Sequence, residues 1–499
     1  MCTVMAWIGW RKALAVSSSL LALGLWCVPL VRAADMISSL DMARNHDPVL
    51  QSAVQAHQVS LTRIPQARAA FLPVVNLTTQ NNISKGNYTF SGNEPNDRSL
   101  RSNSQTLQLT QALYRPAQTH ALAQAELQAV QTLAQLHQAE QDLMQRLLQA
   151  YLELQIAINQ QDVVSAQLKT QDLQLAVARR GLTLGVKTLP EVYEAQSKLS
   201  TSESQVVEAA TQWRVKRQEL FRITGESLQQ KPAQWQALAD NFPLQNWMDK
   251  SDAGAGINAS TLAFWAEQAR LEAPAVRAQT VAVEIALREI HKNRAAHLPT
   301  VDLTVSRARN SSIGNATTAQ NYDSASRVNQ LGVQVTVPLY AGGGTAARVR
   351  EAVSAWEKAQ FDLEAAQLLA ESNAVQAFEG RLAAQAQIQA LQIAIDAAQL
   401  AVTGNAAGVR LGTRTPLDVL TSEQQLATAR KDWRKARYDL ILQTGKLKSA
   451  VGLLEREDFM ALNQGFYSLL PAAVIVAVAT APTAAALTTA TPKTGAARP

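Results

Sequence analysis

The chain has 499 residues, of which 47% are hydrophobic but only 5% aromatic, and its formal net charge is +6. Such a length ordinarily gives several domains with large cores, but so few aromatic side chains favour long helices over thick cores. Both cysteines, Cys2 and Cys27, lie near the N-terminus. The remainder of the chain can therefore form no disulfide.

Residues 1–33 have the pattern of a secretory signal peptide. Basic residues precede a mostly apolar run that ends in the small-residue site Val31-Arg32-Ala33, so we predict cleavage after Ala33. A retained membrane anchor is the alternative, but serines and Pro29 interrupt a run that would need ~20 apolar residues. Lipid attachment at Cys27 is disfavoured because the preceding residue is the bulky Trp26.

The balance of charge in the mature chain argues against a nucleic-acid partner. The whole chain has 46 basic and 40 acidic residues, and the predicted signal peptide takes away three basic ones, Arg11, Lys12 and Arg32. A protein that binds nucleic acid usually carries a basic patch or stripe. The nearly balanced remainder predicts no nucleic acid among the partners.

The mature chain is built from a duplicated unit. The sequence of residues 69–78 returns at 295–304, and that of residues 181–188 returns at 408–415, with shifts of 226 and 227 residues. Matches in the same order at one offset indicate two similar halves. The predicted divisions are a first repeat at 34–228, an inter-repeat segment at 229–260, a second repeat at 261–455, and a C-terminal segment with a disordered tail at 456–499.

Four segments alternate apolar and polar residues with the period of a β-strand. Strands of about 9 to 11 residues with one apolar face suit a membrane barrel that has lipid outside and water inside. The predicted lipid-facing positions are Val75, Leu77, Leu107, Leu109, Val301, Leu303, Val305, Val333, Val335 and Val337.

A soluble sheet with one buried face would show the same alternation. The export signal and the intervening segments 81–104 and 307–330, which are rich in Asn, Ser and Gly and which we interpret as surface loops, favour the membrane. Four strands cannot close a barrel without open edges in lipid. The chain must therefore oligomerise, and composition allows two, three or four copies.

Long helical segments follow each pair of strands. Residues 117–184 carry apolar residues in steps of seven, which is typical of a coiled-coil seam, and at 1.5 Å per residue they would extend about 100 Å. A shorter helix at 190–223 returns after Gly185. Residues 36–70 supply another, broken only by Pro48 near its start and Pro65 near its end. The second half repeats this scheme at 345–411, 416–451 and 261–296. The alternative for these heptads is a solid soluble bundle.

Two glycine pairs mark the turns between the long and short helices. Gly181-x-x-x-Gly185 and Gly408-x-x-x-Gly412 fall where the long helices end, as expected of C-terminal caps. Each turn is followed by a predicted capping box, Thr188-x-x-Glu191 in the first half and Thr415-x-x-Asp418 in the second.

Taken together, these features resemble the TolC-like family of outer-membrane channels of drug efflux and type I protein secretion. The most specific matches are residues 296–303 (AHLPTVDL), residues 337–343 (VPLYAGG) and the two glycine turns. The resemblance implies a mainly α-helical protein with a membrane β-barrel. It also implies a homotrimer whose four-stranded chains together form a twelve-stranded barrel, continued by a hollow helical tunnel through the periplasm.

The resemblance also implies roles for the turns. In this family the hairpin tips form the periplasmic mouth and dock an adaptor protein, so the candidate docking residues are Gly181, Leu184, Gly185, Val186, Gly408, Leu411, Gly412 and Thr413. The residues that match a periplasmic gate are Asp418, Thr421, Arg414 and Glu191.

The gate departs from the family's pattern in two places. Three copies of Asp418 would face one another, repel and attract divalent cations, but the second acidic position of the family is Thr421 here. Arg414 and Glu191 match a pair that links neighbouring helices, whereas Val409 replaces the tyrosine that reinforces this link. Weaker cation block and weaker closure are therefore expected.

Catalysis has little support in the sequence. The six histidines lack metal-binding spacing such as H-E-x-x-H, and neither a phosphate-binding loop nor a nucleophile elbow is present. We therefore expect no enzyme activity, no cofactor and no metal site. The predicted function is a passive export channel of the outer membrane, joined through a periplasmic adaptor to an inner-membrane transporter. The alternative is a non-conducting adaptor or scaffold, and the sequence leaves the cargo open.

Overall fold

The duplication is evident in the secondary structure of the computed structural model, which describes residues 36–88, 96–225, 238–240, 242–244, 262–314 and 322–467. The long helices α3 (Pro116–Thr183) and α8 (Gly344–Arg410) have 68 and 67 residues, and the return helices α4 (Leu189–Thr224) and α9 (Pro416–Val451) have 36 each. The predicted signal cleavage site and C-terminal tail lie outside the described residues.

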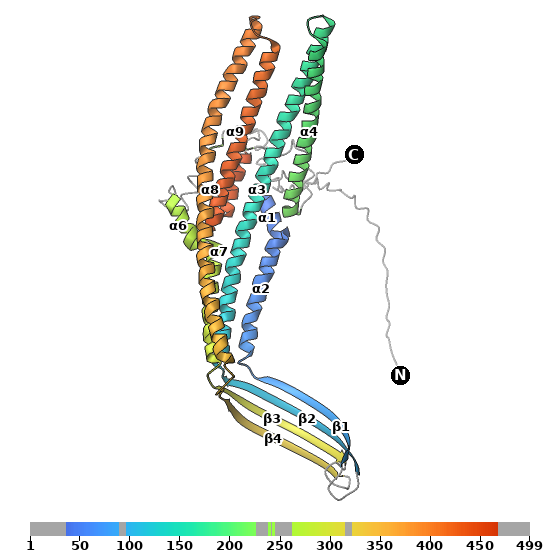
Figure 1. Cartoon of the computed structure of the whole chain (residues 1–499), viewed down its shortest axis with the longest axis vertical. Helices are drawn as coiled ribbons and strands as arrows, with labels where there is room; N and C mark the ends of the chain where they lie inside the picture. Colours follow the sequence, from blue (N-terminus) through green and yellow to red (C-terminus); the bar gives the residue numbers. More distant parts are fainter. Residues whose placement is uncertain are drawn as a thin grey trace, which may run out of the picture. The chain divides into compact units, whose positions relative to one another are not determined.

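Each long helix is accompanied by two shorter ones. Helices α2 (Pro48–Ala69) and α4 both pack along α3, while α7 (Pro274–Ala295) and α9 both pack along α8 (Figure 1). The predicted heptad seam of α3 accounts for this packing, because Ala129, Leu143, Ala150, Ala157 and Val164 are all buried. The two halves meet where α3 contacts α7 and α9.

The helix predicted over 36–70 is interrupted at Pro48, as expected, but α2 continues through Pro65, where a second break was predicted. The chain forms α1 (Met36–His46) and then α2, because Pro48 cannot donate a backbone N–H and disfavours helical angles at Asp47. Asp47 instead caps α2, accepting from the amide of Leu50 at 3.2 Å and binding Arg146 of α3 at 2.8 Å. The second half has the same break, between α6 (Leu262–Glu272) and α7 at Pro274.

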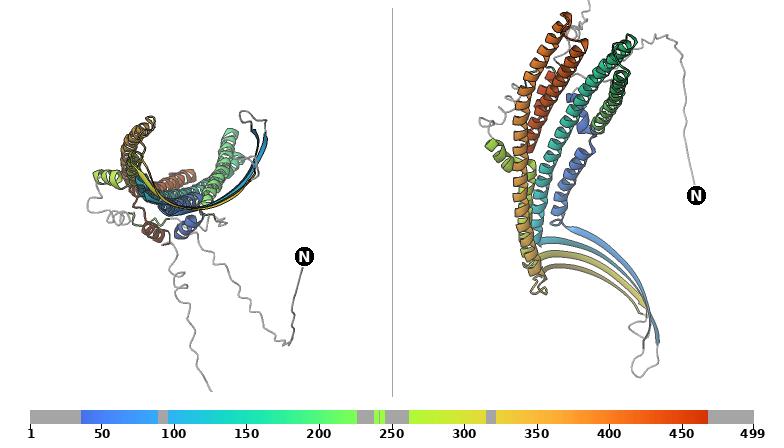
Figure 2. Two further views of the ribbon diagram at one scale, coloured as in Figure 1. Left: turned by 90° about the horizontal axis from the view of Figure 1, so that it is seen from below. Right: turned by 45° about the horizontal axis from the view of Figure 1, so that its top comes forward.

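The four strands form one antiparallel sheet in the order β1-β2-β3-β4. They are β1 (Val74–Tyr88), β2 (Asn96–Tyr114), β3 (Thr300–Gly314) and β4 (Tyr322–Thr336). The two hairpins meet where β2 pairs with β3, so Leu109 lies opposite Val305. Figure 2 shows the four strands curving together.

The strands are longer than predicted, and most of the two predicted loops is strand. Residues 81–88 and 96–104 belong to β1 and β2, and residues 307–314 and 322–330 belong to β3 and β4. Their Asn and Ser side chains look like loop residues in sequence, but they still pair in register. At the other end β4 stops at Thr336, so Val337 was wrongly assigned to a strand.

The cores lie among the helices, where α10 (Arg456–Tyr467) packs against α1. One cluster joins α1, α3, α4, α9 and α10 around buried residues such as Leu147, Tyr438 and Phe459, and a second joins α6, α8 and α9 around Trp265 and Leu447. From the inter-repeat segment, Leu238, Ala239 and Leu244 are buried as well. None of the helices described is long and apolar enough to span a membrane.

Candidate functional site

The two hairpin tips have the same backbone structure. Helix α3 ends with a Schellman motif, in which the amide of Val186 donates to the carbonyl of Gly181 at 2.9 Å and that of Gly185 donates to Leu182 at 3.1 Å. The equivalent bonds run from Thr413 to Gly408 at 2.9 Å and from Gly412 to Val409 at 3.1 Å. The repeat predicted from sequence is therefore preserved at each tip.

Glycine has a specific reason to occupy the turn position of each tip. Gly185 and Gly412 have φ angles of 72° and 74°, in the left-handed region that side chains with a Cβ enter only at a cost. Both face open space, because no other atom lies within 4 Å of the point that a Cβ would occupy. Backbone angle, and not crowding, therefore requires glycine here.

The glycine one turn earlier is required by close approach. A Cβ on Gly181 would lie 2.5 Å from Cγ of Lys187, and one on Gly408 would lie 2.5 Å from Cγ of Arg414. The absent Cβ lets each basic side chain lie across the end of the long helix. Lys187 was not among the residues predicted to matter, and the match between it and Arg414 at the same repeat position could have identified it.

At the first tip, Glu191 is held by its own hairpin. Its carboxylate accepts from the amide and hydroxyl of Thr188 at 2.7 and 3.0 Å and forms an ion pair with Lys187 at 2.8 Å. The hydrogen bond from Lys187, followed by that from the Thr188 amide, lowers the pKa of Glu191 to about 2. Within one chain the partner of Glu191 is thus Lys187 and not Arg414.

At the second tip, Asp418 completes a capping box with Thr415. The amide and hydroxyl of Thr415 donate to the Asp418 carboxylate at 2.8 and 3.0 Å, and the Asp418 amide donates back to the Thr415 hydroxyl at 3.3 Å. These bonds, chiefly the one from the Thr415 amide, lower the pKa of Asp418. Across the ranges that the structure describes, Arg414 forms no ion pair with it. Thr421 hydrogen-bonds the Leu417 carbonyl at 2.9 Å.

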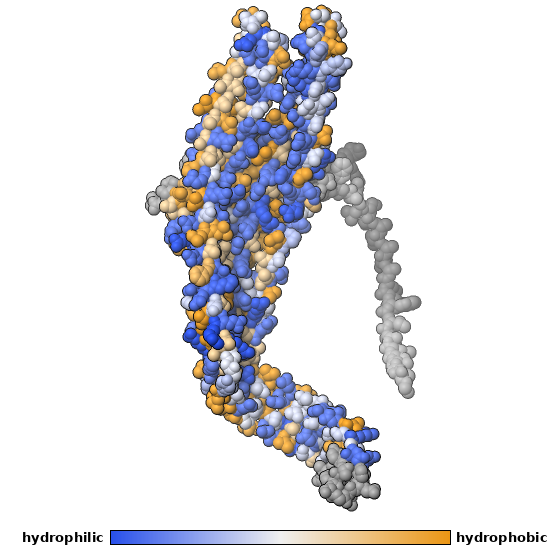
Figure 3. Space-filling view, viewed as in Figure 1, coloured by the Kyte–Doolittle hydropathy of each residue, from blue (hydrophilic) through white to orange (hydrophobic). Residues whose placement is uncertain are grey.

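Apolar side chains surround both tips without covering partners. Leu184, Val186 and Leu411 are 66%, 74% and 79% exposed, and Figure 3 shows apolar residues at the ends of both hairpins. Isolated exposed apolar residues are common on proteins, but a cluster often marks an interaction site. Three further exposed residues next to the turns were missed by sequence reasoning, because they look like ordinary residues of the return helices: Leu189, Tyr193 and Leu417.

The sheet presents a second apolar surface. Cross-strand register places the predicted lipid-facing residues on one face, since Leu77 pairs with Leu107 and Val305 pairs with Leu331. Many of these side chains are exposed, including Leu77 at 71% and Val333 at 61%. The opposite face carries polar residues that hydrogen-bond across strands, such as Ser104 with Asn310 at 2.7 Å.

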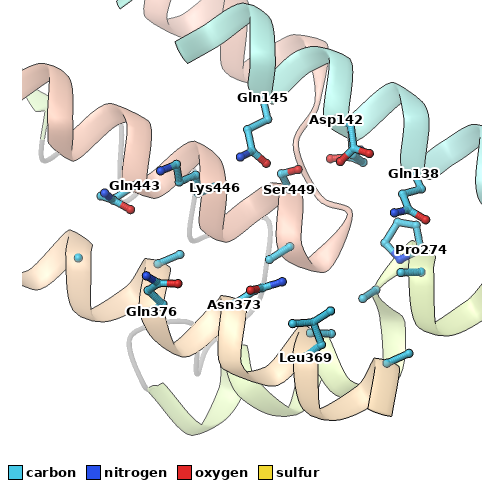
Figure 4. A pocket seen from close by; sticks show the side chains of 18 residues that line it. Gln138, Asp142, Gln145, Pro274, Leu369, Asn373, Gln376, Gln443, Lys446 and Ser449 are labelled. Atoms are coloured by element: carbon cyan, nitrogen blue, oxygen red, sulfur yellow. The ribbon is translucent and has the colours of Figure 1, made fainter. Parts of the chain in front are cut away.

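A polar cavity of about 620 Å³ lies between α3, α8 and α9. Figure 4 shows its walls, with Asp142 from α3, Asn373 from α8 and Lys446 from α9 among the labelled side chains. Burial raises the pKa of Asp142. The lining consists mainly of amides and small side chains. In the described part of the chain, no three His, Cys, Asp or Glu side chains gather closely enough to hold a metal ion.

Comparison with known proteins identifies the family. The sequence pattern of outer membrane efflux proteins matches residues 39–226 and 265–453, which correspond to the two halves. The chain belongs to the outer membrane efflux protein family. It is therefore an export channel protein of the outer membrane, and the adaptor alternative is not favoured.

Curated relatives of this chain match along most of their length. The chain is 26% identical over 439 residues to the alkaline protease secretion protein AprF of Pseudomonas aeruginosa, covering 87% of this chain and 88% of AprF. It is 28% identical over 446 residues to the outer membrane protein TolC of Vibrio cholerae, covering 87% and 94%. The resemblance to the TolC-like family is thus confirmed.

Solved structures show the same fold at lower sequence identity. The Campylobacter jejuni CmeC outer membrane channel matches with a TM-score of 0.67 and 14% identity, over 88% of this chain and 90% of CmeC. The outer membrane protein VceC of Vibrio cholerae matches with a TM-score of 0.64 and 17% identity, over 84% and 97%. The fold is therefore that of outer-membrane channel proteins.

Proposed function

We propose that three copies of this chain assemble into a passive export duct, with a twelve-stranded barrel in the outer membrane and a hollow helical tunnel in the periplasm. The observation that carries this proposal is the sheet. Its edge strands β1 and β4 each pair on one side only within the described residues, and one of its faces is apolar and exposed. Unpaired strand edges are not tolerated in lipid, so further copies must pair with them.

The hairpin tips are the proposed docking site for a periplasmic adaptor protein, which connects the duct to an inner-membrane transporter. The exposed apolar residues around Gly185 and Gly412 support this role, because both tips lie at the end of the helices away from the sheet (Figure 1). The duct has no energy source of its own in this proposal, and the transporter supplies it.

Asp418, Arg414, Thr421 and Glu191 form the proposed periplasmic gate. In a trimer three Asp418 carboxylates approach the axis, and hard divalent cations bind such oxygen ligands readily. Thr421 contributes a hydroxyl at the position where the family has a second carboxylate, which would strengthen block of the channel by divalent cations. The contacts within one chain support a weaker link between Arg414 and Glu191 at this gate, because the charge of Glu191 is already balanced by Lys187.

Outer-membrane fractionation followed by conductance in planar lipid bilayers tests the proposal. In fractionated cells the full-length protein should sediment with the outer membrane. After purification it should migrate as a trimer when chemically cross-linked and form channels with one discrete conductance. If the protein is a monomer and does not conduct, the trimeric duct is rejected and the non-conducting scaffold is favoured.

The proposed cargo is a small toxic molecule or a secreted protein, because the names of its relatives include both efflux and protease secretion. Deleting the gene separates these two. Increased antibiotic susceptibility with an unchanged set of secreted proteins would assign efflux, and loss of a secreted protein with unchanged susceptibility would assign type I secretion.

A further inference from the structure

Three arginines lie on the apolar face of the sheet, beyond the apolar positions Val305 of β3 and Leu331 of β4. In β3 the residues on this face are Val305, Arg307 and Arg309, because alternate residues of a strand point to the same side. In β4, Leu331 pairs with Val305 and Arg327 pairs with Arg309. All three arginines are exposed. Arg307, Arg309 and Arg327 are called the arginine patch below.

The patch lies at the height where a membrane barrel leaves the hydrocarbon. Arg327 is ten residues from Val337, the first residue past the helix-proximal end of β4. At about 3.4 Å per residue and a strand tilt of about 40°, this separation is roughly 26 Å along the membrane normal, and the apolar band of such barrels is about 25 Å tall. Arg309 and Arg327 therefore border the apolar band on the side away from the helices, and Arg307, which pairs with Leu107, lies at its margin.

Within the described residues, the three arginines have no counter-charge in contact with them. Arg309 and Arg327 lie directly opposite each other across the strands, an arrangement of like charges that destabilises a sheet. Among the described residues, no ion pair or hydrogen bond reaches any of the three. The nearest acid along β4, Asp323, is four residues farther out and pairs with Ile313, roughly 13 Å away along the strand.

The opposite face of the sheet cannot supply that counter-charge. Ser306 and Ala308 alternate with the arginines and are half-buried, as expected on the inner side of a curved sheet (Figure 2). Farther along this face, the Ser312 and Ser324 hydroxyls hydrogen-bond to each other at 2.7 Å. The arginines thus lie on the outer side, where the surroundings of the barrel and not its lumen must provide an anion.

We propose that the arginine patch binds the phosphate groups of phosphorylated lipids in the outer membrane. This inference rests on the proposed function, since it requires the apolar face to contact lipid. Guanidinium groups bind phosphate oxygens through paired, charge-assisted hydrogen bonds, and basic residues beside a membrane surface attract anionic head groups. A phosphate between Arg309 and Arg327 also removes their mutual repulsion. The continuity of the patch with the apolar face selects a lipid over a free ion.

Lipid binding by the full-length channel tests the proposal. The protein is reconstituted in phosphatidylcholine nanodiscs, and binding of diphosphorylated lipid A is compared with that of the same lipid after removal of its phosphates. The test variant is Arg309→Gln with Arg327→Gln. The matched control, Arg214→Gln with Arg222→Gln, removes two exposed charges from α4. Inorganic phosphate is added as a competitor, and bilayer conductance is recorded on every preparation.

Wild type and the control should bind diphosphorylated lipid A at least about tenfold more tightly than the test variant, consistent with the strength of charge-assisted bonds. The dephosphorylated lipid should bind weakly and equally to all three. Equal binding by the test variant and wild type would overturn the proposal, and so would tight binding of the dephosphorylated lipid. Complete competition by millimolar inorganic phosphate would assign the patch to a free ion instead.

Conductance separates this inference from the proposed function. If the variants conduct like wild type but lipid binding does not depend on the arginines, only the arginine patch is rejected. If wild type itself neither inserts nor conducts, the proposed duct is rejected together with the patch.

Discussion

The two hairpin tips share one backbone but hold their charges differently. At the first tip, Lys187 and Glu191 form an ion pair at 2.8 Å. At the second, Arg414 and Asp418 occupy the same positions of the repeat, yet the Asp418 carboxylate is bound chiefly by Thr415. Aspartate is one methylene shorter than glutamate, so it satisfies the helix cap without also reaching the basic side chain. The duplication therefore preserved the turn at both tips. At the second tip, however, the Asp418 carboxylate and the Arg414 guanidinium are not paired with each other.

The largest expected effect comes from the feature that the tips share. Replacing Gly185 and Gly412 together with Val places a β-branched residue in the left-handed region at both turns, at a cost of about 1 to 2 kcal/mol per position. We expect export to fall to the level of a deletion strain while the trimer remains in the outer membrane. Antibiotic susceptibility or secreted protein, measured beside membrane content, checks this.

Asparagine provides the matched control, since it tolerates left-handed angles better than other side chains. The Gly185→Asn, Gly412→Asn variant should retain export. Full export by the valine variant would show that the tips are not the docking site.

The next largest effect is on block of the channel by divalent cations, which should differ between substitutions at the two tips. If Asp418 lines the proposed gate, Asp418→Ala should weaken block of the single-channel current by divalent cations by about tenfold, because it removes the carboxylate ligands. Glu191→Ala should change the block by less than about twofold, since Lys187 already neutralises that carboxylate. Equal conductance and cation sensitivity in Asp418→Ala and wild type would rule out a charged gate.

A smaller effect concerns the titration of the two carboxylates. Lys187→Gln should raise the pKa of Glu191 from about 2 toward the ordinary 4.5, because the hydrogen bond from Lys187 is the main cause of its low value. Arg414→Gln should leave the pKa of Asp418 close to that of wild type, because the Thr415 amide is the main cause there. Carboxyl NMR titration of the full-length protein measures both, and similar shifts in the two variants would contradict the difference between the tips.

The sign of the pH dependence follows from the lowered pKa of Glu191. A carboxylate with a lowered pKa stabilises the folded hairpin at pH values above its unfolded pKa. The contribution of the Glu191 cap is therefore complete above pH about 4.5 and is lost as the pH falls through about 2.

The smallest expected effect arises at the glycine before each turn. Gly181→Ala places a Cβ 2.5 Å from Cγ of Lys187, so the lysine must move away and the pKa of Glu191 should rise slightly. Gly408→Ala displaces Arg414 instead, and the pKa of Asp418 should not change. Gly404→Ala, where nothing lies within 4 Å, controls for the higher helix propensity of alanine. If Gly408→Ala raised the pKa of Asp418 as much as Gly181→Ala raises that of Glu191, the basic side chain would affect the carboxylate equally at both tips, which contradicts the proposed difference.

The sequence predicted the helices more accurately than the strands. The heptad seam and the glycine turns placed α3, α4, α8 and α9 within a residue or two at each end. The strands were predicted too short because β pairing continues past the apolar band through Asn and Ser residues, whose local preference is for loops. Periodicity identifies the residues that must avoid water, but the outer parts of these strands have no such requirement.

The tips illustrate the same limit at the level of side chains. The spacing of Thr415 and Asp418 predicted a capping box, and the structure contains it. The Lys187–Glu191 ion pair was not predicted, because it depends on the side chain of Lys187 crossing Gly181. The gate and docking roles come from family resemblance and concern contacts between chains, so they stay predictions.

The pairing of β2 with β3 has a consequence for how this chain reaches its native state. It joins positions such as Ser104 and Asn310, which are 206 residues apart. Ordering contacts of such long range requires closing a large loop, which slows folding. The first hairpin is synthesised long before its neighbouring strand and must wait with an unpaired edge. Until β3 pairs with it, β2 is therefore an exposed strand edge of the kind that promotes aggregation.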